Sequence, residues 1–278
     1  MSKIGILHPG EMGISVAASA IHNDHQVYWT SHGRSDKTRV RAENYKLTEV
    51  EFLSQLCQTC EIILSICPPH EAENVAQSVI EAGFRGLYLD ANAIAPQRST
   101  KIGKLMEARG IRFVDGGIIG GPAWTPKETW LYLSGEHAQE IASCFSNGSL
   151  DTKIIGNQIG KASALKICYA AYSKGTIALL AAVLAASESF EVRENLYEQW
   201  DMDNTGFSDQ VSQRVRGATR KAWRFEGEMK EIARTFQEVG LTNEFHEAAA
   251  DIYHRMVGFK DATDTPSLHE VIQSLLTK

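Results

Sequence analysis

Short apolar runs alternate with longer amphipathic stretches over the first 155 residues of the chain. Apolar runs bounded by turn residues are typical of buried strands, and a 3.6-residue apolar period is typical of helices. We predict strands at residues 3–7, 26–30, 61–67, 86–90, 111–114, 130–134 and 153–155. We predict helices at residues 14–21, 49–56, 71–81, 100–109 and 138–145. Strands and helices that alternate at this spacing form an α/β fold with a doubly wound, mostly parallel sheet.

The pattern becomes entirely helical after residue 156. An Ala- and Leu-rich stretch over residues 161–191 predicts one long helix that is apolar around much of its circumference. Such a helix is buried on several sides, so we expect it to run through a domain interface or a dimer core. Further helices are predicted at residues 209–219, 222–239, 243–256 and 268–276. We therefore predict two domains, an α/β domain over residues 1–156 and an all-α domain over residues 157–278.

The first predicted strand leads straight into a glycine turn and a helix. The turn consists of His8, Pro9, Gly10, Glu11, Met12 and Gly13. A helix N-terminus offers unpaired N–H groups and the positive end of a dipole, which favour the pyrophosphate of a dinucleotide. Gly10 would let the backbone approach the phosphates and Gly13 would let the helix pack on the strand, although His8 replaces the first glycine of the G-x-G-x-x-G motif. The turn favours a Rossmann-type dinucleotide site over an ordinary strand-to-helix turn.

The end of the second predicted strand indicates which dinucleotide binds. An NAD site places Asp or Glu about 20 residues after the glycines, where the acid holds the ribose 2′-hydroxyl. Residues 29–35 contain no acid. Arg34 can instead pair with a 2′-phosphate, and Ser31 and Ser35 can donate hydrogen bonds to it. We predict NADP(H) as the cofactor, with a solvated polar loop as the alternative.

Other predicted strands end in residues that belong at the same edge of the sheet. Ligands of parallel sheets bind beyond the carboxyl ends of the strands. Cys67, Pro68, Pro69, Asn92 and residues 116–122 follow such ends. We expect them to face one crevice together with the glycine turn, with the first four beside the cofactor.

The composition excludes some classes of function. The chain has 278 residues, of which 43% are hydrophobic, and a net charge of −6 without a basic tract, so we expect no nucleic-acid partner. Its longest apolar run, residues 177–186, is shorter than the about 20 residues that span a bilayer. The N-terminus leads into a strand rather than a signal peptide. We expect a cytoplasmic protein without membrane contact.

The cysteines point to a reducing compartment. There are five, an odd number spread along the chain, which favours reduced thiols in the cytosol. Cys57 and Cys60 have C-x-x-C spacing, but no second pair lies nearby for zinc. Their segment also precedes a strand instead of opening a helix, so we expect ordinary thiols and no metal site.

Four segments together resemble motifs of the β-hydroxyacid dehydrogenase superfamily, which includes 3-hydroxyisobutyrate and 6-phosphogluconate dehydrogenases and the imine reductases. The segments are residues 8–13 (the glycine turn), 90–96 (the strand end beside the nicotinamide), 113–122 (the substrate loop) and 160–166 (the start of the interdomain helix). The resemblance implies hydride transfer, a catalytic lysine at Lys166 and a homodimer with interlocked C-terminal helices. More narrowly, the chain resembles a poorly characterised NAD(P)-dependent branch of this superfamily.

The chain also departs from the family pattern. Ile119 stands where the substrate loop usually carries a serine, and Ala170 stands where the helix usually carries an asparagine. In the family these polar groups hold the carboxylate and hydroxyl of a substrate, so a simple 3-hydroxy acid is not expected. Gly227 and Glu228 replace a lysine–aspartate pair of the family's C-terminal helices.

Lys166 is the candidate general acid/base. Its side chain would donate a proton to a developing alkoxide or amide anion, or remove one from an alcohol. Burial would lower the pKa of such a lysine, while a lysine that only extends from a buried helix is the alternative. Lys161 and Lys174 match the family position less well. Asn92 is the second candidate, through a hydrogen bond to the nicotinamide ribose or the substrate, unless it only shapes the turn.

The remaining site candidates would form the substrate pocket. Gly120 and Gly121 leave backbone N–H groups open to a substrate oxygen, or form a plain tight turn. Ile119 precedes them. Trp124, Tyr169 and Tyr172 are candidate walls of the pocket, although aromatic residues at helical spacing also fill cores.

These observations favour an NADP(H)-dependent oxidoreductase that acts on a small-molecule alcohol or carbonyl. An imine reductase of the same superfamily is the first alternative, but Lys166 favours an oxygen substrate because imine reductases often carry Asp or Tyr there. A non-catalytic NADPH-binding sensor is the second alternative, since a Rossmann fold does not guarantee catalysis. A sensor has no need of a buried acid/base group.

Overall fold

The computed structural model describes residues 1–277 and divides into two compact units. The first unit comprises residues 1–167 and the second begins at residue 168. Their boundary falls inside the long helix α7 (Lys161–Ser189), after its first turns. The boundary predicted from the sequence, after residue 156, lies before this helix. Lys166 therefore belongs to the first unit.

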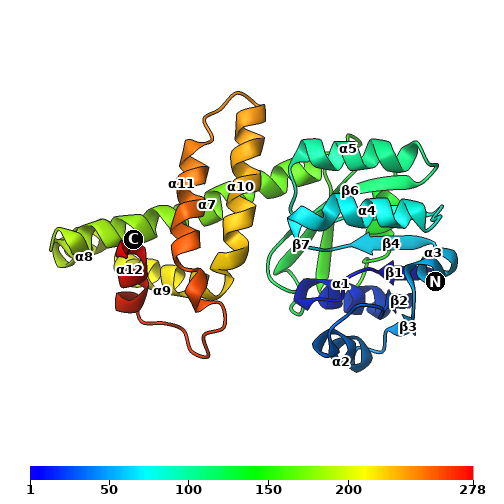
Figure 1. The fold of residues 1–278 in the computed structure, drawn as a ribbon, viewed down its shortest axis with the longest axis horizontal. Coiled ribbons are helices and arrows are strands. Elements are labelled where there is room, and N and C mark those ends of the chain that lie inside the picture. Colours follow the sequence, from blue (N-terminus) through cyan, green and yellow to red (C-terminus); the bar gives the residue numbers. More distant parts are fainter. Residues whose placement is uncertain (278) are drawn as a thin grey trace. The chain divides into compact units, whose positions relative to one another are not determined.

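An eight-stranded sheet forms the centre of the first unit (Figure 1). Its strands are β1 (Lys3–Ile6), β2 (Gln26–Thr30), β3 (Thr48–Val50), β4 (Ile62–Ser65), β5 (Leu87–Asp90), β6 (Arg112–Ile119), β7 (Thr129–Ser134) and β8 (Leu150–Ile154). They lie in the order β3-β2-β1-β4-β5-β6-β7-β8, and only the β6–β7 pair is antiparallel. The first six follow the order of a dinucleotide-binding sheet, whose crevice opens where the order reverses between β1 and β4. The predicted doubly wound, mostly parallel sheet is confirmed.

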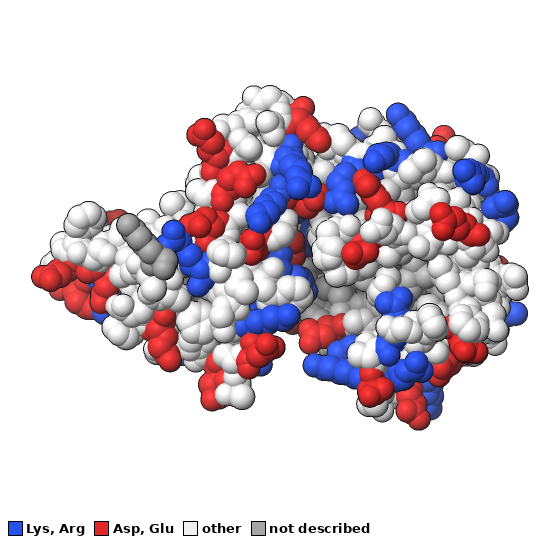
Figure 2. Space-filling view, viewed as in Figure 1, with Lys and Arg blue, Asp and Glu red and all other residues white. Residues whose placement is uncertain are grey.

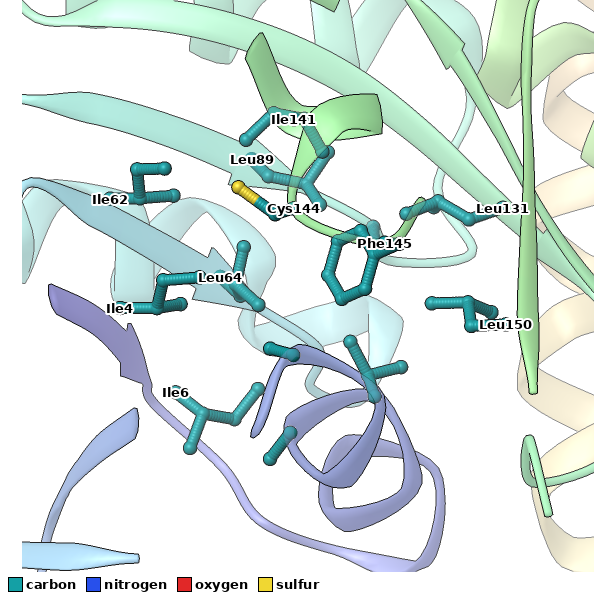
Figure 3. Close-up of a cluster of buried hydrophobic side chains, with 14 of the residues drawn as sticks. Ile4, Ile6, Ile62, Leu64, Leu89, Leu131, Ile141, Cys144, Phe145 and Leu150 are labelled. Atoms are coloured by element: carbon teal, nitrogen blue, oxygen red, sulfur yellow. The ribbon is translucent and has the colours of Figure 1, made fainter. Parts of the chain in front are cut away.

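Helices cover both faces of this sheet because its strands are apolar on both faces. On one face lie α1 (Glu11–His22), α2 (Asp36–Asn44) and α6 (Ala138–Ser143); on the other lie α3 (Leu53–Thr59), α4 (Ala72–Glu81) and α5 (Pro96–Glu107). Figure 3 shows Ile4, Leu64 and Leu89 from three strands, with Phe145 from the segment after α6, in the first of these cores. Ile63 and Phe113 belong to the second core, as the two-residue period of a strand requires.

The described part of the second unit is all-α, as predicted. After α7 it contains α8 (Arg193–Asp203), α9 (Phe207–Ala218), α10 (Ala222–Glu238), α11 (Glu244–Arg255) and α12 (Leu268–Leu276). The ring of Tyr253 on α11 packs edge-on against Phe225 of α10, with centroids 5.3 Å apart. The Tyr253 hydroxyl donates a hydrogen bond to the carbonyl of Lys174 at 2.8 Å, which ties α11 to α7.

Several predicted elements need correction, and others were missed. The helix predicted over residues 49–56 is wrong, because Thr48–Val50 forms the edge strand β3 and α3 begins at Leu53. Helices α2 and α8 were missed because they bury almost nothing: Ala42 is the one buried residue of α2, and α8 has none. Strand β6 continues through Gly116 and Gly117 to Ile119, where a loop was expected, because β7 pairs with it there.

Helix α7 is long and apolar enough to cross a membrane by length and composition alone. However, 44% of its most apolar stretch is buried inside the structure, and the core helix of a globular protein passes the same test. Figure 2 shows Lys and Arg side chains interspersed with Asp and Glu on the face in view.

Candidate functional site

The glycine turn between β1 and α1 leaves room for a ligand at the start of the helix. Gly10 is the N-cap of α1, and no side chain caps this end. A Cβ added to Gly10 would meet no atom within 4 Å, so the backbone is open to a ligand here. A Cβ added to Gly13 would lie 2.2 Å from the carbonyl oxygen of His8, so only glycine fits where the helix packs on the turn. Both observations fit a pyrophosphate at the helix N-terminus.

Two buried polar atoms beside this turn lack a partner within the described chain. They are Nδ1 of His8 and Nε of Arg34. Burial lowers the pKa of His8 to about 4, and the positive charge of Arg34 adds to this effect. Burial also lowers the pKa of Arg34, which the nearby Cys67 thiol opposes. Side chains from the ends of β1, β2 and β4 thus converge, and their unpaired nitrogen atoms suit a phosphate or ribose.

Arg39, on α2, stabilises the loop after β2 that carries Arg34. Arg39 donates to the carbonyl of Ser31 at 2.8 Å and also pairs with Glu49 at 3.4 Å. Ser31 is buried, whereas Ser35 is exposed and lies 3.1 Å from the hydroxyl of Thr38. Arg39 therefore stabilises the loop, and Arg34 is the arginine whose buried nitrogen has no partner there.

A second arginine lies beside the glycine turn, and it was not among the predicted site residues. Arg41, on α2, donates from Nη1 to the carbonyl of Pro9 at 3.3 Å. This places a positive charge against the predicted phosphate site. Only the prediction of α2 could have revealed it, and that helix has no apolar stripe.

Asn92 joins the ends of β4 and β5. Its side-chain Oδ1 accepts a hydrogen bond from the Cys67 N–H at 2.5 Å, and its Nδ2 donates to the Ser65 hydroxyl at 3.1 Å. Its own N–H donates to Asp90 at 3.0 Å, and only 2% of the residue is exposed. The amide of Asn92 thus holds the Cys67-Pro68-Pro69 segment in place.

Lys166 lies in the second turn of α7, directly over β6. A Cβ added to Gly117 would lie 2.6 Å from the carbonyl oxygen of Ala162 and 3.0 Å from the Cβ of Lys166. Gly117 therefore lets the helix backbone pack against the strand. Lys166 is half-buried, while Lys161, at the first position of the helix, is exposed.

The segment after β6 packs against the start of α1. The N–H of Ala123 donates to the Ser15 hydroxyl at 2.8 Å, which ties this loop to the glycine-turn helix. Gly120 has a φ of +126°, a conformation that requires glycine, and Gly121 has open space around it. The Trp124 ring is 46% exposed and stacks on Tyr45, with centroids 5.0 Å apart.

The remaining candidates lie in the second unit. Tyr169 and Tyr172 are exposed in the second unit, by 47% and 70%. Lys174 forms a buried ion pair with Glu228, one of the positions at which the chain departs from the family pattern. The Lys174 ammonium also lies over the Phe225 ring. These contacts give Lys174 a structural role.

The two thiols of the C-x-x-C segment are both buried. Burial raises the pKa of Cys57 and of Cys60 to about 12. Thiols with such values remain protonated at neutral pH and are poor nucleophiles and metal ligands.

Sequence comparison identifies the two parts of the chain separately. The NAD binding domain of 6-phosphogluconate dehydrogenase matches residues 3–145, and a domain of unknown function (DUF1932) matches residues 188–256. An uncharacterised 28.5 kDa protein of Methanothermus fervidus is 26% identical over 217 residues, which cover 78% of this chain and 83% of that protein.

Solved structures of dehydrogenases and reductases share the fold. The 3-hydroxyisobutyrate dehydrogenase of Mycobacterium tuberculosis superimposes with a TM-score of 0.74 at 16% identity, and the match covers 100% of both chains. A reductive aminase from Aspergillus terreus, solved with NADPH, cyclohexanone and allyl amine, gives a TM-score of 0.59 at 15% identity over 98% of both chains. Identities this low show a common fold.

Proposed function

Since the chain belongs to the family with the NAD binding domain of 6-phosphogluconate dehydrogenase, we propose that it is an NADP(H)-dependent oxidoreductase with Lys166 as its general acid/base. The single observation that carries this proposal is the placement of Lys166. Its helical turn packs directly on β6 of the same unit that carries the glycine turn. A lysine tied to the nucleotide-binding sheet is suited to proton transfer beside the cofactor.

The residues at the crevice fit a dinucleotide with an added phosphate. The open N-terminus of α1 would hold the pyrophosphate, with Gly10 allowing close approach. Arg34, with its buried unpartnered Nε, would pair with the 2′-phosphate, and Arg41 adds a positive charge nearby. When bound, the nicotinamide supplies or accepts a hydride. Asn92 would fix the Cys67-Pro68-Pro69 segment beside it.

Lys166 would manage the proton at the reacting oxygen. In the reductive direction its ammonium Nζ donates a proton to the oxygen as negative charge develops there, and in the oxidative direction its neutral amine accepts one. The charged form also stabilises the developing alkoxide before the proton moves. Both roles require that Nζ keep a fixed place relative to the sheet.

The substrate is proposed to be a small carbonyl compound or alcohol without a carboxylate at the family's usual place. Ile119 ends β6 with an apolar side chain, and Ala170 is buried and apolar. Neither offers a hydrogen bond to a carboxylate or hydroxyl. The same absence favours a neutral imine as the second candidate substrate, because an imine also lacks these groups.

A homodimer is proposed on the basis of an exposed apolar stripe on α7. The stripe recurs every three or four residues, as in a coiled-coil seam. Its exposed members are Tyr169, Tyr172, Leu179, Ala186 and Phe190, just past the helix end, while Val183 and the polar Thr176 at the intervening positions are half-buried. Tyr172, Leu179 and Phe190 are 70%, 50% and 77% exposed, and a second copy of the chain would cover them. We propose a cytoplasmic location, which the five free cysteines support.

The experiment that tests the function is a turnover panel. NADPH consumption is measured with aldehydes, neutral ketones, keto acids and cyclic imines, and NADH is tested in parallel. Turnover of neutral carbonyls with NADPH supports the proposal, and turnover of imines alone selects the second candidate. Tight NADPH binding without turnover of any class supports a sensor and contradicts the enzyme.

A further inference from the structure

Four polar side chains lie in register on four neighbouring strands of the first unit's sheet, β4 to β7. Ser65 of β4 pairs with Asp90 of β5, Asp90 with Asp115 of β6, and Asp115 with Ser134 of β7. Each is between 0% and 1% exposed. A buried carboxylate is costly unless it is hydrogen-bonded, so such a row requires an explanation.

The two carboxylates of this row have very different surroundings. Asp90 accepts a hydrogen bond from the Asn92 N–H at 3.0 Å, and its Oδ2 has no partner among the described residues. Burial raises the pKa of Asp90 to about 7, and the charge of Asp115 adds to the rise. Asp115 by contrast accepts six hydrogen bonds. Its donors are the hydroxyls of Ser99 (2.7 Å), Ser134 (2.9 Å) and Ser163 (2.5 Å), and the N–H groups of Gly160 (2.9 Å), Ala162 (2.9 Å) and Ser163 (3.0 Å).

Half of these donors belong to the backbone at the start of α7. A helix N-terminus has unpaired N–H groups and a positive dipole end, which a carboxylate satisfies. Usually the capping residue lies next to the helix in sequence, but Asp115 comes from β6, 45 residues before Gly160. The cap therefore fastens the first turn of α7 to the centre of the sheet, and Ser99 fastens α5 to the same carboxylate.

Lys166 follows one turn after the capped residues. Gly117 lies two residues after Asp115 on β6 and therefore faces the same side of the sheet. It packs closely against Ala162 and the Cβ of Lys166, so it contacts the same segment of α7. Asp115 thus fixes the start of α7 by hydrogen bonds, and Gly117 sets the distance between this part of the helix and the sheet. The position of the Lys166 side chain depends on both.

We propose that Asp115 is a positioning residue, which sets the place of the Lys166 ammonium by anchoring the first turn of α7 to β6. This inference rests on the proposed function, since it assumes that Lys166 performs the acid/base step. Asp115 acts through Lys166 and does not itself contact the substrate. Ser163 contributes through its hydroxyl, which donates to the same carboxylate.

The test is a double-mutant cycle with Asp115→Asn and Lys166→Ala, using the best substrate of the turnover panel. Asp115→Asn is expected to lower kcat about 10²-fold, because a misplacement near 1 Å costs about that much. Its effect on the Kd of NADPH should stay within about twofold. In the Lys166→Ala background the same substitution should change the residual kcat less than about twofold, because the residue through which it acts is gone.

A matched control and a milder variant complete the design. Asp201 also accepts hydrogen bonds at the start of a helix, α9, from the N–H of Ser208 at 3.0 Å and from its hydroxyl at 2.6 Å, but it is not fully buried and lies only seven residues before its donor. Asp201→Asn should leave kcat unchanged. Ser163→Ala removes one bond to Asp115 and should lower kcat by about 3- to 10-fold; this variant decides the question if Asp115→Asn does not fold.

A second readout does not need a substrate. Hydrogen exchange of the backbone N–H groups of Ala162 and Ser163 should become at least about tenfold faster in Ser163→Ala, because a bond to a charged acceptor is lost. Unchanged exchange there would overturn the proposed anchor.

The outcomes separate the two proposals. If Lys166→Ala keeps full turnover, the proposed function fails, whatever Asp115 does. If Lys166→Ala loses turnover while Asp115→Asn and Ser163→Ala keep it, the positioning role fails and the function stands. An equal loss from Asp115→Asn in both backgrounds would mean a purely structural role and would also overturn the inference.

Discussion

The substitution Gly117→Ala tests the contact between α7 and the sheet. The new Cβ would lie 2.6 Å from the carbonyl oxygen of Ala162 and 3.0 Å from the Cβ of Lys166. Ordinary carbon–oxygen contacts begin near about 3.3 Å and carbon–carbon contacts near about 3.5–4.0 Å. The start of α7 must therefore move away by about 0.5–1 Å, because the atoms in the way include backbone.

Two quantities follow from this displacement. Forcing an extra carbon into a packed contact costs about 1–3 kcal/mol, which for a unit of this size lowers Tm by about 2–12 °C. A shift of Lys166 by up to about 1 Å should lower kcat by about 10- to 100-fold. The Kd of NADPH should stay within about twofold, because the glycine turn lies on β1 and α1.

The assay combines thermal unfolding, NADPH titration and turnover on one purified variant. Gly217→Ala is the matched control: a Cβ at Gly217 in α9 meets nothing within 4 Å, so it should stabilise by about 0.5–1 kcal/mol and leave kcat unchanged. Wild-type Tm and kcat in Gly117→Ala would refute the packing argument. A lowered Tm with wild-type kcat would refute the link between the packing and Lys166.

Three further predictions address the cofactor, acidification and assembly. Arg34→Ser should raise the Kd of NADPH by about 10- to 100-fold in a fluorescence titration and leave that of NADH within about twofold; equal losses for both would count against NADP preference. The pKa of His8 is lowered from 6.5 to about 4 in the folded chain, so the unfolded chain binds more protons between these values and acidification destabilises the fold. The free energy of unfolding of the wild type relative to His8→Gln should fall by about 2 kcal/mol from pH 7 to pH 5 in urea titrations, and a constant difference would contradict the burial of His8. Leu179→Glu should convert the dimer into a monomer in light scattering, and a wild type that is already monomeric at micromolar concentration would disprove the dimer.

Much of the fold was predictable because it follows from local patterns. The buried strands are short apolar runs, and their alternation with helices predicts a mostly parallel sheet, although not the order of its strands. The failures have two causes. Helix α2 buries only Ala42 and α8 buries nothing, so neither carries the apolar period on which the prediction depends. Strand β3 has three residues and exists only because β2 pairs with it.

The candidate site was predictable only where its residues lie within one segment. The glycine turn and the loop with Arg34 are local motifs. The cap of α7 by Asp115 is not, because its donors lie between 16 and 48 residues away along the chain. Arg41 on Pro9 and Asn92 on Cys67 are also separated by 32 and 25 residues. Only the pairing of strands in the sheet brings these groups together.

The role of Lys166 in proton transfer is tested by comparing Lys166→Ala with Lys166→Arg in turnover and in NADPH affinity. Both variants are expected to lose kcat by at least about 10²-fold, since arginine keeps the charge but does not give up its proton, and to bind NADPH within about twofold of the wild type. Turnover near that of the wild type in Lys166→Ala would exclude proton transfer by Lys166.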